Sequence, residues 1–317
     1  VSFLSDRGGS SQVWRAPLGE GDARQVTDVE ADVAGFSIAP DGERIAIWFD
    51  EASDCAETSC PDTPDADDAG SGRSYDEIFV RHWSSWNNHT RSRLVTFALA
   101  EGVATGEGVV VSRPLNGNTP SRPFGGGEEI AWHPSGASLF FTLREAGPTE
   151  PISTDLDIYR VSADGSSAPE LLTAENDALD SLPTPSPDGR YLAYVAMARP
   201  GYESDRTVLH LRDLVTGETR ALTQNWDRSV QGIAWAPDGQ SLWMVAKEGL
   251  DTAVLRYVLA LGAIERVSGA GSISALSPQS DGSLIVAMAS ALAPSDLYRL
   301  TPDGTMEQLT SVNGERL

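Results

Sequence analysis

The sequence predicts an all-β protein built from repeated four-stranded units. The first observation is a stretch of two apolar runs around a tight polar turn, IAWAPDGQSLWMVA, from Ile233 to Ala246. In this turn Pro237 presets φ, Asp238 can bond the backbone ahead of it and Gly239 accepts a positive φ, so the stretch forms a β-hairpin. The second observation is that the hairpin recurs along the chain. The third is that two more short strands follow each copy.

The hairpin is written five times. The other copies are FSIAPDGERIAIWF at 36–49, IAWHPSGASLFFT at 130–142, LPTPSPDGRYLAYVAM at 182–197 and ALSPQSDGSLIVAM at 275–288. The turn glycines Gly42, Gly136, Gly189, Gly239 and Gly282 are separated by 94, 53, 50 and 43 residues. A period in the forties to fifties, with one hairpin in each period, is the spacing of β-propeller blades.

Third and fourth strands complete each unit. The third strands align at 11–18, 93–100, 156–163, 207–214, 253–260 and 295–302. The fourth strands read ARQVTD, PELLTA, TRALTQ, IERVSG and MEQLTS, and most of them close on a Leu-Thr or Val-Thr pair. Short strands bounded by Gly, Pro and Asp, four to a unit, predict a propeller of four-stranded blades.

We expect residues 1–317 to form one propeller domain with six visible blades. Their approximate ranges are 1–28, 29–114, 126–174, 176–224, 225–269 and 270–311. The first blade is incomplete because no Pro-Asp-Gly hairpin arm precedes its strands. A closed propeller hides its sheet edges, so the ring either closes with six blades or is part of a seven-bladed propeller, which is the arrangement we expect.

The second repeat carries an acidic insert at 50–77, which holds ten acidic residues and one basic residue. Such a composition predicts a solvated excursion from the blade. The insert contains both cysteines of the chain, Cys55 and Cys60. With two sulfurs and no neighbouring histidine, a zinc site is not expected, and a small surface disulfide is the better hypothesis in an oxidising compartment. We expect no metal and no cofactor.

An aromatic and cationic arm, EIFVRHWSSWNNHTRSRLVTF, follows at 77–97. One interpretation is that the arm touches a ligand or a partner domain. The other is that its tryptophans pack it back onto the propeller while its histidines cap a turn. The candidate contact residues crowd into nine positions: Arg81, His82, Trp83, Trp86 and His89.

The charge balance excludes several partners. The chain has 46 acidic against 23 basic residues, a formal net charge of −23. Such a surface repels phosphate backbones and anionic headgroups, so we expect neither nucleic acid nor a membrane surface as partner. No stretch approaches the roughly 18 apolar residues of a spanning helix, and the first residues do not form an export signal.

Catalytic motifs are absent from the sequence. It contains no Gly-x-Ser-x-Gly elbow, no His-Glu-x-x-His and no Gly-rich phosphate loop. Cys55 and Cys60 are poor nucleophiles because the surrounding carboxylates favour the thiol over the thiolate. His133 replaces a turn residue and His210 lies in a third strand, so we expect structural roles for both. We therefore expect no catalytic residue in this chain.

The patterns resemble the N-terminal β-propeller of the prolyl oligopeptidase family of serine peptidases, in its dipeptidyl aminopeptidase and acylaminoacyl peptidase branch. The residues that carry the resemblance are SDRGGSSQVWR at 5–15, the repeated Pro-Asp-Gly hairpins and FVRHWSSWNNHTRSRL at 79–94. The resemblance covers essentially all 317 residues. The arm is its most specific part, because no blade requires that pattern.

The resemblance implies a two-domain enzyme in which the propeller covers an α/β-hydrolase domain with a Ser, Asp and His triad, expected just after Leu317. The propeller then gates the enzyme and admits short peptides, and its carboxylates can hold a peptide amino terminus. No triad residue carries over to this chain. The alternative is a free-standing TolB-like propeller that acts as a protein-binding scaffold. We expect a periplasmic location, with the cytoplasm as the alternative.

Overall fold

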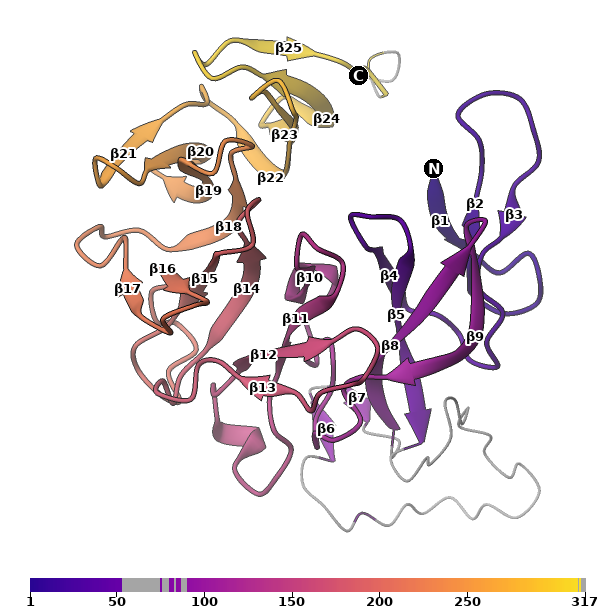
Figure 1. The fold of residues 1–317 in the computed structure, drawn as a ribbon. Coiled ribbons are helices and arrows are strands. Elements are labelled where there is room, and N and C mark those ends of the chain that lie inside the picture. The colour runs from indigo at the N-terminus through magenta and orange to yellow at the C-terminus, as the bar shows by residue number, and fades with distance from the viewer. Residues whose placement is uncertain (53–74, 76–79, 83, 87–89, 313, 315–317) are drawn as a thin grey trace. The chain divides into compact units, whose positions relative to one another are not determined.

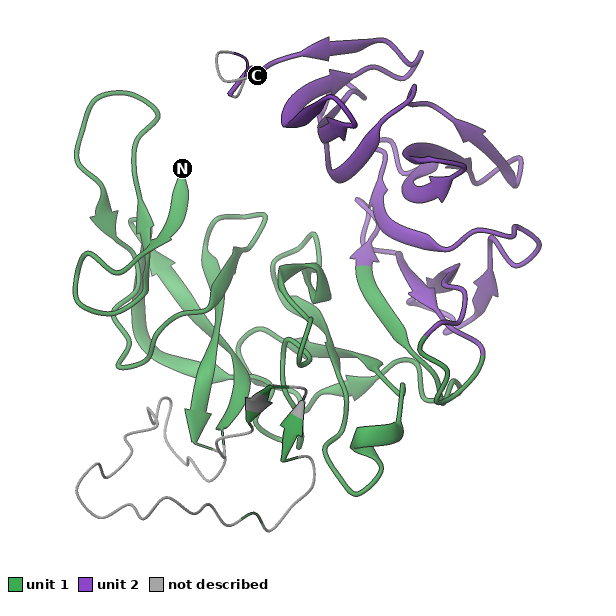
Figure 2. Cartoon of the chain, turned by 180° about the vertical axis from the view of Figure 1, so that it is seen from behind, with its two compact units in different colours: residues 1–183, 199–203 green, residues 184–198, 204–317 purple. Residues whose placement is uncertain are grey.

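The computed structural model describes residues 1–52, 75, 80–82, 84–86, 90–312 and 314. It confirms the all-β class: the described residues form antiparallel sheets, with two short 3₁₀ helices, η1 (Gly127–Glu129) and η2 (Glu150–Ile152), and no α-helix. No helix among them has the length and apolar character to cross a bilayer. The chain divides into two compact units, 1–183 with 199–203 and 184–198 with 204–317 (Figure 2).

The first unit contains three sheets and a small hairpin (Figure 1). The first sheet has three strands, β1 (Ser2–Ser5), β2 (Gln12–Arg15) and β3 (Arg24–Gln25). The second sheet has the order β4 (Gly35–Ile38), β5 (Arg44–Ala52), β8 (Thr90–Ala100) and β9 (Val103–Val110). The third has the order β10 (Ile130–Trp132), β11 (Ser138–Leu143), β12 (Asp157–Ser162) and β13 (Glu170–Leu171). The hairpin pairs β6 (Arg81–His82) with β7 (Ser85–Trp86).

The second unit continues the same pattern, and the strand that opens its first sheet begins in the first unit. This sheet has the order β14 (Asp180–Pro185), β15 (Tyr191–Ala196), β16 (Val208–Asp213) and β17 (Thr219–Ala221). The next strands are β18 (Val230–Trp235), β19 (Ser241–Glu248), β20 (Asp251–Val258) and β21 (Ala263–Arg266). The last are β22 (Ser272–Pro278), β23 (Leu284–Ser290), β24 (Ala293–Leu300) and β25 (Met306–Gln308). A single parallel pair, Thr252 with Ser272, joins these two groups into one eight-stranded sheet.

Four antiparallel strands in sequence order are the architecture of a propeller blade, so the predicted blade type is confirmed. The number of blades in a closed ring stays a prediction, and so do the blade boundaries.

The five hairpin turns have the predicted chemistry. The glycines Gly42, Gly136, Gly189, Gly239 and Gly282 have φ between 67° and 84°, and each donates its N–H to the carbonyl oxygen three residues earlier. The residue before each glycine accepts a backbone N–H two residues ahead of itself. It is Asp41, Asp188, Asp238 and Asp281 in four turns, and Ser135 in the turn that reads Ser-Gly.

A hydroxyl clamp explains why fourth strands close on a Thr. The hydroxyl oxygen of Thr173 accepts the backbone N–H of Ile158 in the third strand at 3.0 Å. The same bond, at 2.9 to 3.0 Å, recurs in every other repeat: Thr27 with Val13, Ser112 with Leu94, Thr223 with Leu209, Ser268 with Val254 and Thr310 with Leu297. The bond satisfies a backbone N–H of the third strand, which has no carbonyl partner in the fourth strand because that strand is short.

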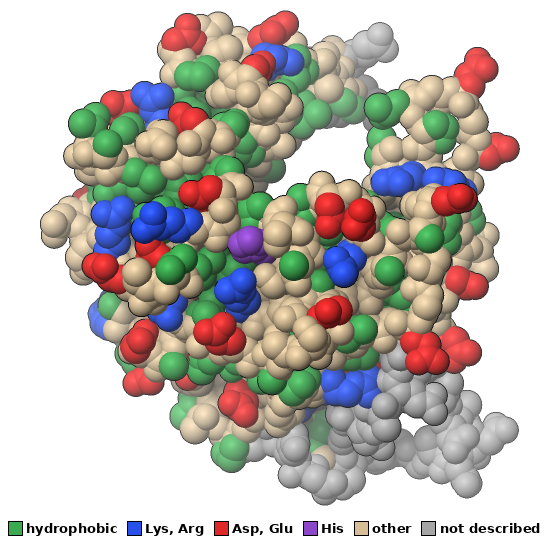
Figure 3. Space-filling view, viewed as in Figure 1, with side chains coloured by type: hydrophobic (Ala, Val, Ile, Leu, Met, Phe, Trp, Pro, Cys, Tyr) green, Lys and Arg blue, Asp and Glu red, His purple; other side chains and the backbone are tan. Residues whose placement is uncertain are grey.

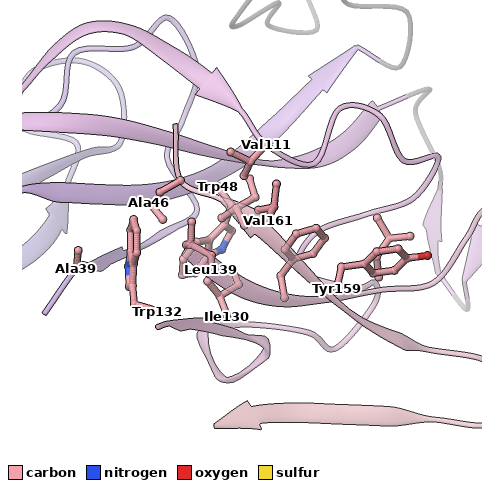
Figure 4. Close-up of a cluster of buried hydrophobic side chains, with 13 residues drawn as sticks. Ala39, Ala46, Trp48, Val111, Ile130, Trp132, Leu139, Tyr159 and Val161 are labelled. Atoms are coloured by element: carbon pink, nitrogen blue, oxygen red, sulfur yellow. The ribbon is translucent and has the colours of Figure 1, made fainter. Parts of the chain in front are cut away.

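Tryptophans connect neighbouring sheets inside each unit. In the first unit Trp132 and Trp48 lie in one buried cluster with Ile130 and Leu139 (Figure 4). The indole N–H of Trp132 also bonds the carbonyl oxygen of Ser37, at 3.2 Å. In the second unit the indole N–H of Trp235 bonds the carbonyl oxygen of Thr184, at 2.9 Å. The small residue between two bulky ones in each IAW strand therefore serves the packing of sheet on sheet.

Candidate functional site at the root of the arm

The acidic insert and the start of the arm connect the ends of two long strands in the second sheet. β5 and β8 stay in register out to the pair Ala52 and Thr90, so the ladder holds both ends of the intervening segment side by side. β8 is 11 residues long, the longest strand that the structure describes. The last pairs before the arm include Glu51 with Arg91 and Asp50 with Ser92. Charged residues thus occupy the end of an otherwise apolar pair of strands.

A buried ion network fixes this root. The Glu51 side chain is 1% exposed, and one of its oxygens accepts from Nε of Arg93 at 3.1 Å while the other accepts from Nη2 of Arg113 at 3.2 Å. Nη1 of Arg93 also donates to the carbonyl oxygens of Leu115, at 2.9 Å, and Gly117, at 3.3 Å. One buried carboxylate therefore ties both root strands to the segment that follows β9.

Burial works against these charges. It raises the pKa of Glu51 by more than the guanidinium groups of Arg113 and Arg93 lower it. Burial also lowers the pKa of Arg93, and the Glu51 carboxylate opposes that shift. Each charge is stable only because the other is present, so the removal of either one leaves an uncompensated buried ion.

A second group of carboxylates lies next to Gly117, whose carbonyl oxygen Arg93 binds. Gly117 forms a β-bridge with Glu145, at the end of the third sheet. Burial raises the pKa of Asp157, and a 2.8 Å hydrogen bond from the Thr173 hydroxyl lowers it; the carboxylates of Asp155, Asp177 and Glu145 raise it by smaller amounts. Together with Asp180 these side chains lie beside the root of the arm. We call the set Glu145, Asp155, Asp157 and Asp180 the acidic group.

Asp180 is the most buried member of the acidic group. It is 1% exposed at the start of β14, and its Oδ2 accepts from the Asn176 amide at 3.1 Å. Its Oδ1 has no hydrogen-bond partner in the described part of the chain. Burial, with smaller contributions from Asp157 and Asp155, raises the pKa of Asp180 to about 8. Asp180 is therefore a neutral carboxylic acid near pH 7.

The hairpin of β6 and β7 brings two of the predicted contact residues together. Arg81 pairs with Trp86 across the hairpin, and its guanidinium carbon lies 5.3 Å from the centre of the Trp86 ring. Tyr75 stacks on the same indole with ring centroids 6.3 Å apart and planes at 22°. Trp86 remains 54% exposed. The three side chains thus form an exposed aromatic and cationic surface.

The other predicted residues are placed in part. His82 contributes backbone to β6. Trp83, His89, Cys55 and Cys60 lie outside the described residues, so their roles and the disulfide stay predictions. Whether the arm touches a ligand or only packs on the propeller also stays open.

The remaining histidines lie in structural positions. Nδ1 of His133 is 2.8 Å from the Ser135 hydroxyl within the hairpin turn. His210 packs on Tyr194 in the fourth sheet, with ring centroids 5.3 Å apart, and burial lowers its pKa. Among the described residues no three His, Cys, Asp or Glu side chains are placed to hold a metal ion.

Glu51, Arg93, Arg113 and the acidic group were not among the site residues predicted from the sequence. A signal was present for the first two, since charged residues interrupt two apolar strands on either side of the insert. Arg113 and the acidic group lie in different repeats, and only the packing of the sheets brings them to the same end of the unit.

Comparison with known proteins defines the class to which this geometry belongs. No protein-family model matches the chain. It is 28% identical to dipeptidyl-peptidase 5 of Porphyromonas gingivalis over 316 residues, which cover 99% of this chain and 45% of that protein. It is 27% identical to dipeptidyl-peptidase 5 of Arthroderma otae over 246 residues, 72% of this chain and 33% of that protein. The chain spans less than half the length of these curated relatives.

Solved structures show the same fold. Acylaminoacyl peptidase of Pyrococcus horikoshii matches with a TM-score of 0.69 and 16% identity, over 100% of this chain and 44% of that one. The β-propeller domain of the Trilobed protease of Pyrococcus furiosus matches with a TM-score of 0.63 and 13% identity, over 98% and 80%. A putative TolB of Agrobacterium tumefaciens matches with a TM-score of 0.56 and 15% identity, over 91% and 84%.

The fold therefore defines the protein as a β-propeller. The similarity to dipeptidyl-peptidase 5 along nearly the whole chain confirms the resemblance to the N-terminal propeller of a peptidase of the prolyl oligopeptidase family.

Proposed function

We propose that this chain is the non-catalytic propeller of a serine peptidase, which selects short peptides for an α/β-hydrolase domain in the same protein. The alignment with dipeptidyl-peptidase 5 carries the proposal, because it takes up 99% of this chain but only 45% of the relative. More than half of such a relative lies outside the match, which leaves room for a catalytic domain.

The construction of the sheets supports a gating role. Size selection needs a framework that does not yield when a large substrate presses on it. The hydroxyl clamp fixes the third strand to the fourth in every repeat, and the Trp132 and Trp235 bonds join neighbouring sheets within each unit. Local opening of such a framework requires several buried bonds to break together.

The root of the arm supports a contact role for Arg81 and Trp86. A rigid base that presents exposed aromatic and cationic groups is a common design for binding loops. Here the buried Glu51 network fixes the base, and the half-exposed Trp86 with Arg81 forms the contact surface. We assign this surface to contact with the peptide or with the hydrolase domain.

The test compares two purified proteins, the 317-residue chain and a version extended through the downstream reading frame. Chromogenic dipeptide and acyl-amino-acid substrates measure activity, and a folded protein substrate measures size selection. We expect cleavage of the short substrates by the extended form alone, with the folded substrate left intact. Cleavage by the 317-residue chain, or a downstream frame that encodes no hydrolase, contradicts the proposal.

A second candidate is a free-standing scaffold. The observation that favours it is the match to the putative TolB, of which this chain covers 84%. For a scaffold we expect a protein partner and no peptidase activity in either form. Affinity capture with the 317-residue chain from its own source, followed by identification of a saturable partner, distinguishes this function from the first.

We further propose a periplasmic location, which an oxidised Cys55–Cys60 pair would suit. Fractionation of cells, combined with thiol labelling before and after reduction, tests both points. Labelling without reduction, in protein recovered from the cytoplasm, contradicts them.

A further inference from the structure

Three groups of four strands repeat one arrangement across their second, third and fourth strands. A third-strand arginine stands opposite a fourth-strand glutamate and beside a bulky apolar residue of the second strand. In the third sheet the set is Phe140, Arg160 and Glu170; in the next two groups of strands it is Trp243, Arg256 and Glu265, then Ile285, Arg299 and Glu307. The guanidinium carbons of Arg160 and Arg256 each lie 5.9 Å from the centre of the neighbouring ring.

The sheet of β14 to β17 breaks this arrangement at all three positions. The corresponding residues are Ala193, Leu211 and Arg220, which are register partners in that order. Ala193 follows its turn glycine by four residues, as Phe140 and Trp243 follow theirs. The ring is therefore replaced by a methyl group, the arginine by leucine and the acid by a base.

A cavity of about 280 Å³ lies at this place, in the second unit. Leu211 and Arg220, two of the three residues that depart from the arrangement, line it. The lining residues are Arg190, Tyr191, Leu211, Asp213, Glu218 and Arg220. The volume is just below the usual range for ligand pockets, about 300 to 1,000 Å³, so only a small ligand fits it.

Two of the four charges in the cavity already have partners. Oδ2 of Asp213 accepts from Nε and Nη2 of Arg190, at 3.2 and 2.9 Å. Its Oδ1 accepts the backbone N–H groups of Val215 and Thr216, at 2.9 and 3.1 Å, and these bonds lower the pKa of Asp213. Arg190 also stacks on Tyr191, at 5.0 Å. Arg190 and Asp213 thus line the cavity with side chains that are held in place by other contacts.

The other two charges have no partner. Neither the guanidinium of Arg220 nor the carboxylate of Glu218 makes a hydrogen bond or an ion pair in the described part of the chain. The first sheet shows the contrast: the arginine of its last strand, Arg24, stands opposite Arg15 and donates to the carbonyl oxygen of Glu101 at 2.9 Å. Arg220 thus combines a guanidinium that has no partner in the described part of the chain with space beside it.

We propose that this cavity binds the carboxylate of a small peptide or amino acid, with Arg220 as its anchor. A planar guanidinium with free N–H groups pairs best with a carboxylate, through two parallel hydrogen bonds. Glu218 lines the same cavity and accepts from an amino or amide N–H of the ligand. The chain carries a net charge of −23, which repels anions. The guanidinium of Arg220 offsets this repulsion locally, so that a carboxylate can approach. Figure 3 shows Lys and Arg side chains gathered where Figure 1 labels β16 and β17.

Calorimetric titration at low salt with three probes tests the chemistry. The probes are Ala-Ala, N-acetyl-Ala-Ala and Ala-Ala-amide. We expect binding of the two probes that have a free carboxylate, Ala-Ala and N-acetyl-Ala-Ala. Of these two, Ala-Ala should bind more tightly, because its amino group is free to bond Glu218. Equal binding of the amide, or binding of none of the probes at millimolar concentration, overturns the proposal.

Variants locate the site. Arg220→Gln removes the anchor charge, and the double substitution Leu211→Arg with Arg220→Glu introduces the arginine–glutamate pair that the other groups of strands have. We expect both to weaken binding of N-acetyl-Ala-Ala by about tenfold or more, since a charged hydrogen bond contributes about 1.5 to 3 kcal/mol. Arg212→Ala is the matched control: it removes the same charge from the other face of the strand pair, where Arg212 bonds Thr219. Equal loss in Arg212→Ala, or unchanged binding in folded Arg220→Gln, overturns the assignment.

Discussion

The indole N–H of Trp132 donates a hydrogen bond to the carbonyl oxygen of Ser37, 95 residues earlier in the chain, at 3.2 Å. This bond joins the first strand of the third sheet to the first strand of the second. Trp132 is 7% exposed, so it combines a buried apolar ring with a donor that has a fixed partner. Its counterpart in the second unit, Trp235 with Thr184, shows that this junction recurs between repeats.

Trp132→Phe keeps most of the apolar area but removes the donor. We expect a loss of about 1 to 3 kcal/mol in the free energy of unfolding, from the unsatisfied carbonyl oxygen and the smaller ring. Chemical denaturation measures it. Trp86→Phe is the control, because Trp86 is 54% exposed. An equal effect of the two substitutions contradicts the prediction.

Thr173→Val removes one hydroxyl clamp at nearly constant volume. The backbone N–H of Ile158 then loses its acceptor and Asp157 loses the 2.8 Å bond from the same hydroxyl. We expect a destabilisation of about 1 to 3 kcal/mol. Thr219→Val, on the exposed fourth strand of another sheet, should change stability by less than about 0.5 kcal/mol. Hydrogen exchange of the Ile158 amide checks the mechanism, since faster exchange at this amide is required.

Glu51→Gln leaves Arg93 buried without its counter-ion. We expect a destabilisation of about 3 to 5 kcal/mol and faster proteolysis of the arm, whose two ends Glu51 and Arg93 hold together. The double substitution Glu51→Leu with Arg93→Leu should recover part of the loss, because it removes the two most buried charges together and the remaining Arg113 side chain is 27% exposed. Thermal unfolding and limited proteolysis measure both. A double variant that is less stable than Glu51→Gln would show that the charges themselves are favourable.

Asp180 makes stability depend on pH. Its pKa is raised from 3.8 to about 8 in the folded protein. Between about pH 4 and pH 8 the unfolded chain therefore releases a proton that the folded protein keeps, so stability falls as pH rises through this window. Asp180→Asn removes this titration. We therefore expect the stability of the variant, relative to that of the parent protein, to increase from pH 5 to pH 9. Melting temperatures at pH 5, 7 and 9 test this. A constant difference between the two proteins at all three values contradicts it.

Trp86→Ala probes the arm in the extended protein. Because Trp86 is half-exposed, we expect little change in melting temperature but a change in kcat/KM that depends on the length of the peptide substrate. Leu250→Ala is the control, since Leu250 is fully exposed in the turn between β19 and β20. Parallel behaviour of the two variants on all substrates would show that Trp86 does not contact substrate.

The sequence alone determined the repeating features. Turn residues such as Pro237, Asp238 and Gly239 act within a few residues, so their φ preferences and hydrogen bonds can be read directly from the chain. The same holds for strand alternation and for the closing Thr, whose partner lies 13 to 18 residues away in the neighbouring strand. The all-β class and the four-stranded blades follow from these local rules.

Tertiary structure decided which charges meet. Glu51 and Arg113 are 62 residues apart, and Asp180 at the start of β14 interacts with Asp157 at the start of β12. Their pKa shifts arise from burial, which depends on packing between sheets and not on neighbours in sequence. The cavity at Arg220 follows the same rule. Ala193 and Arg220, which stand where other repeats have a bulky apolar residue and a glutamate, can be read in the sequence. Only the strand register shows that they lie on either side of Leu211.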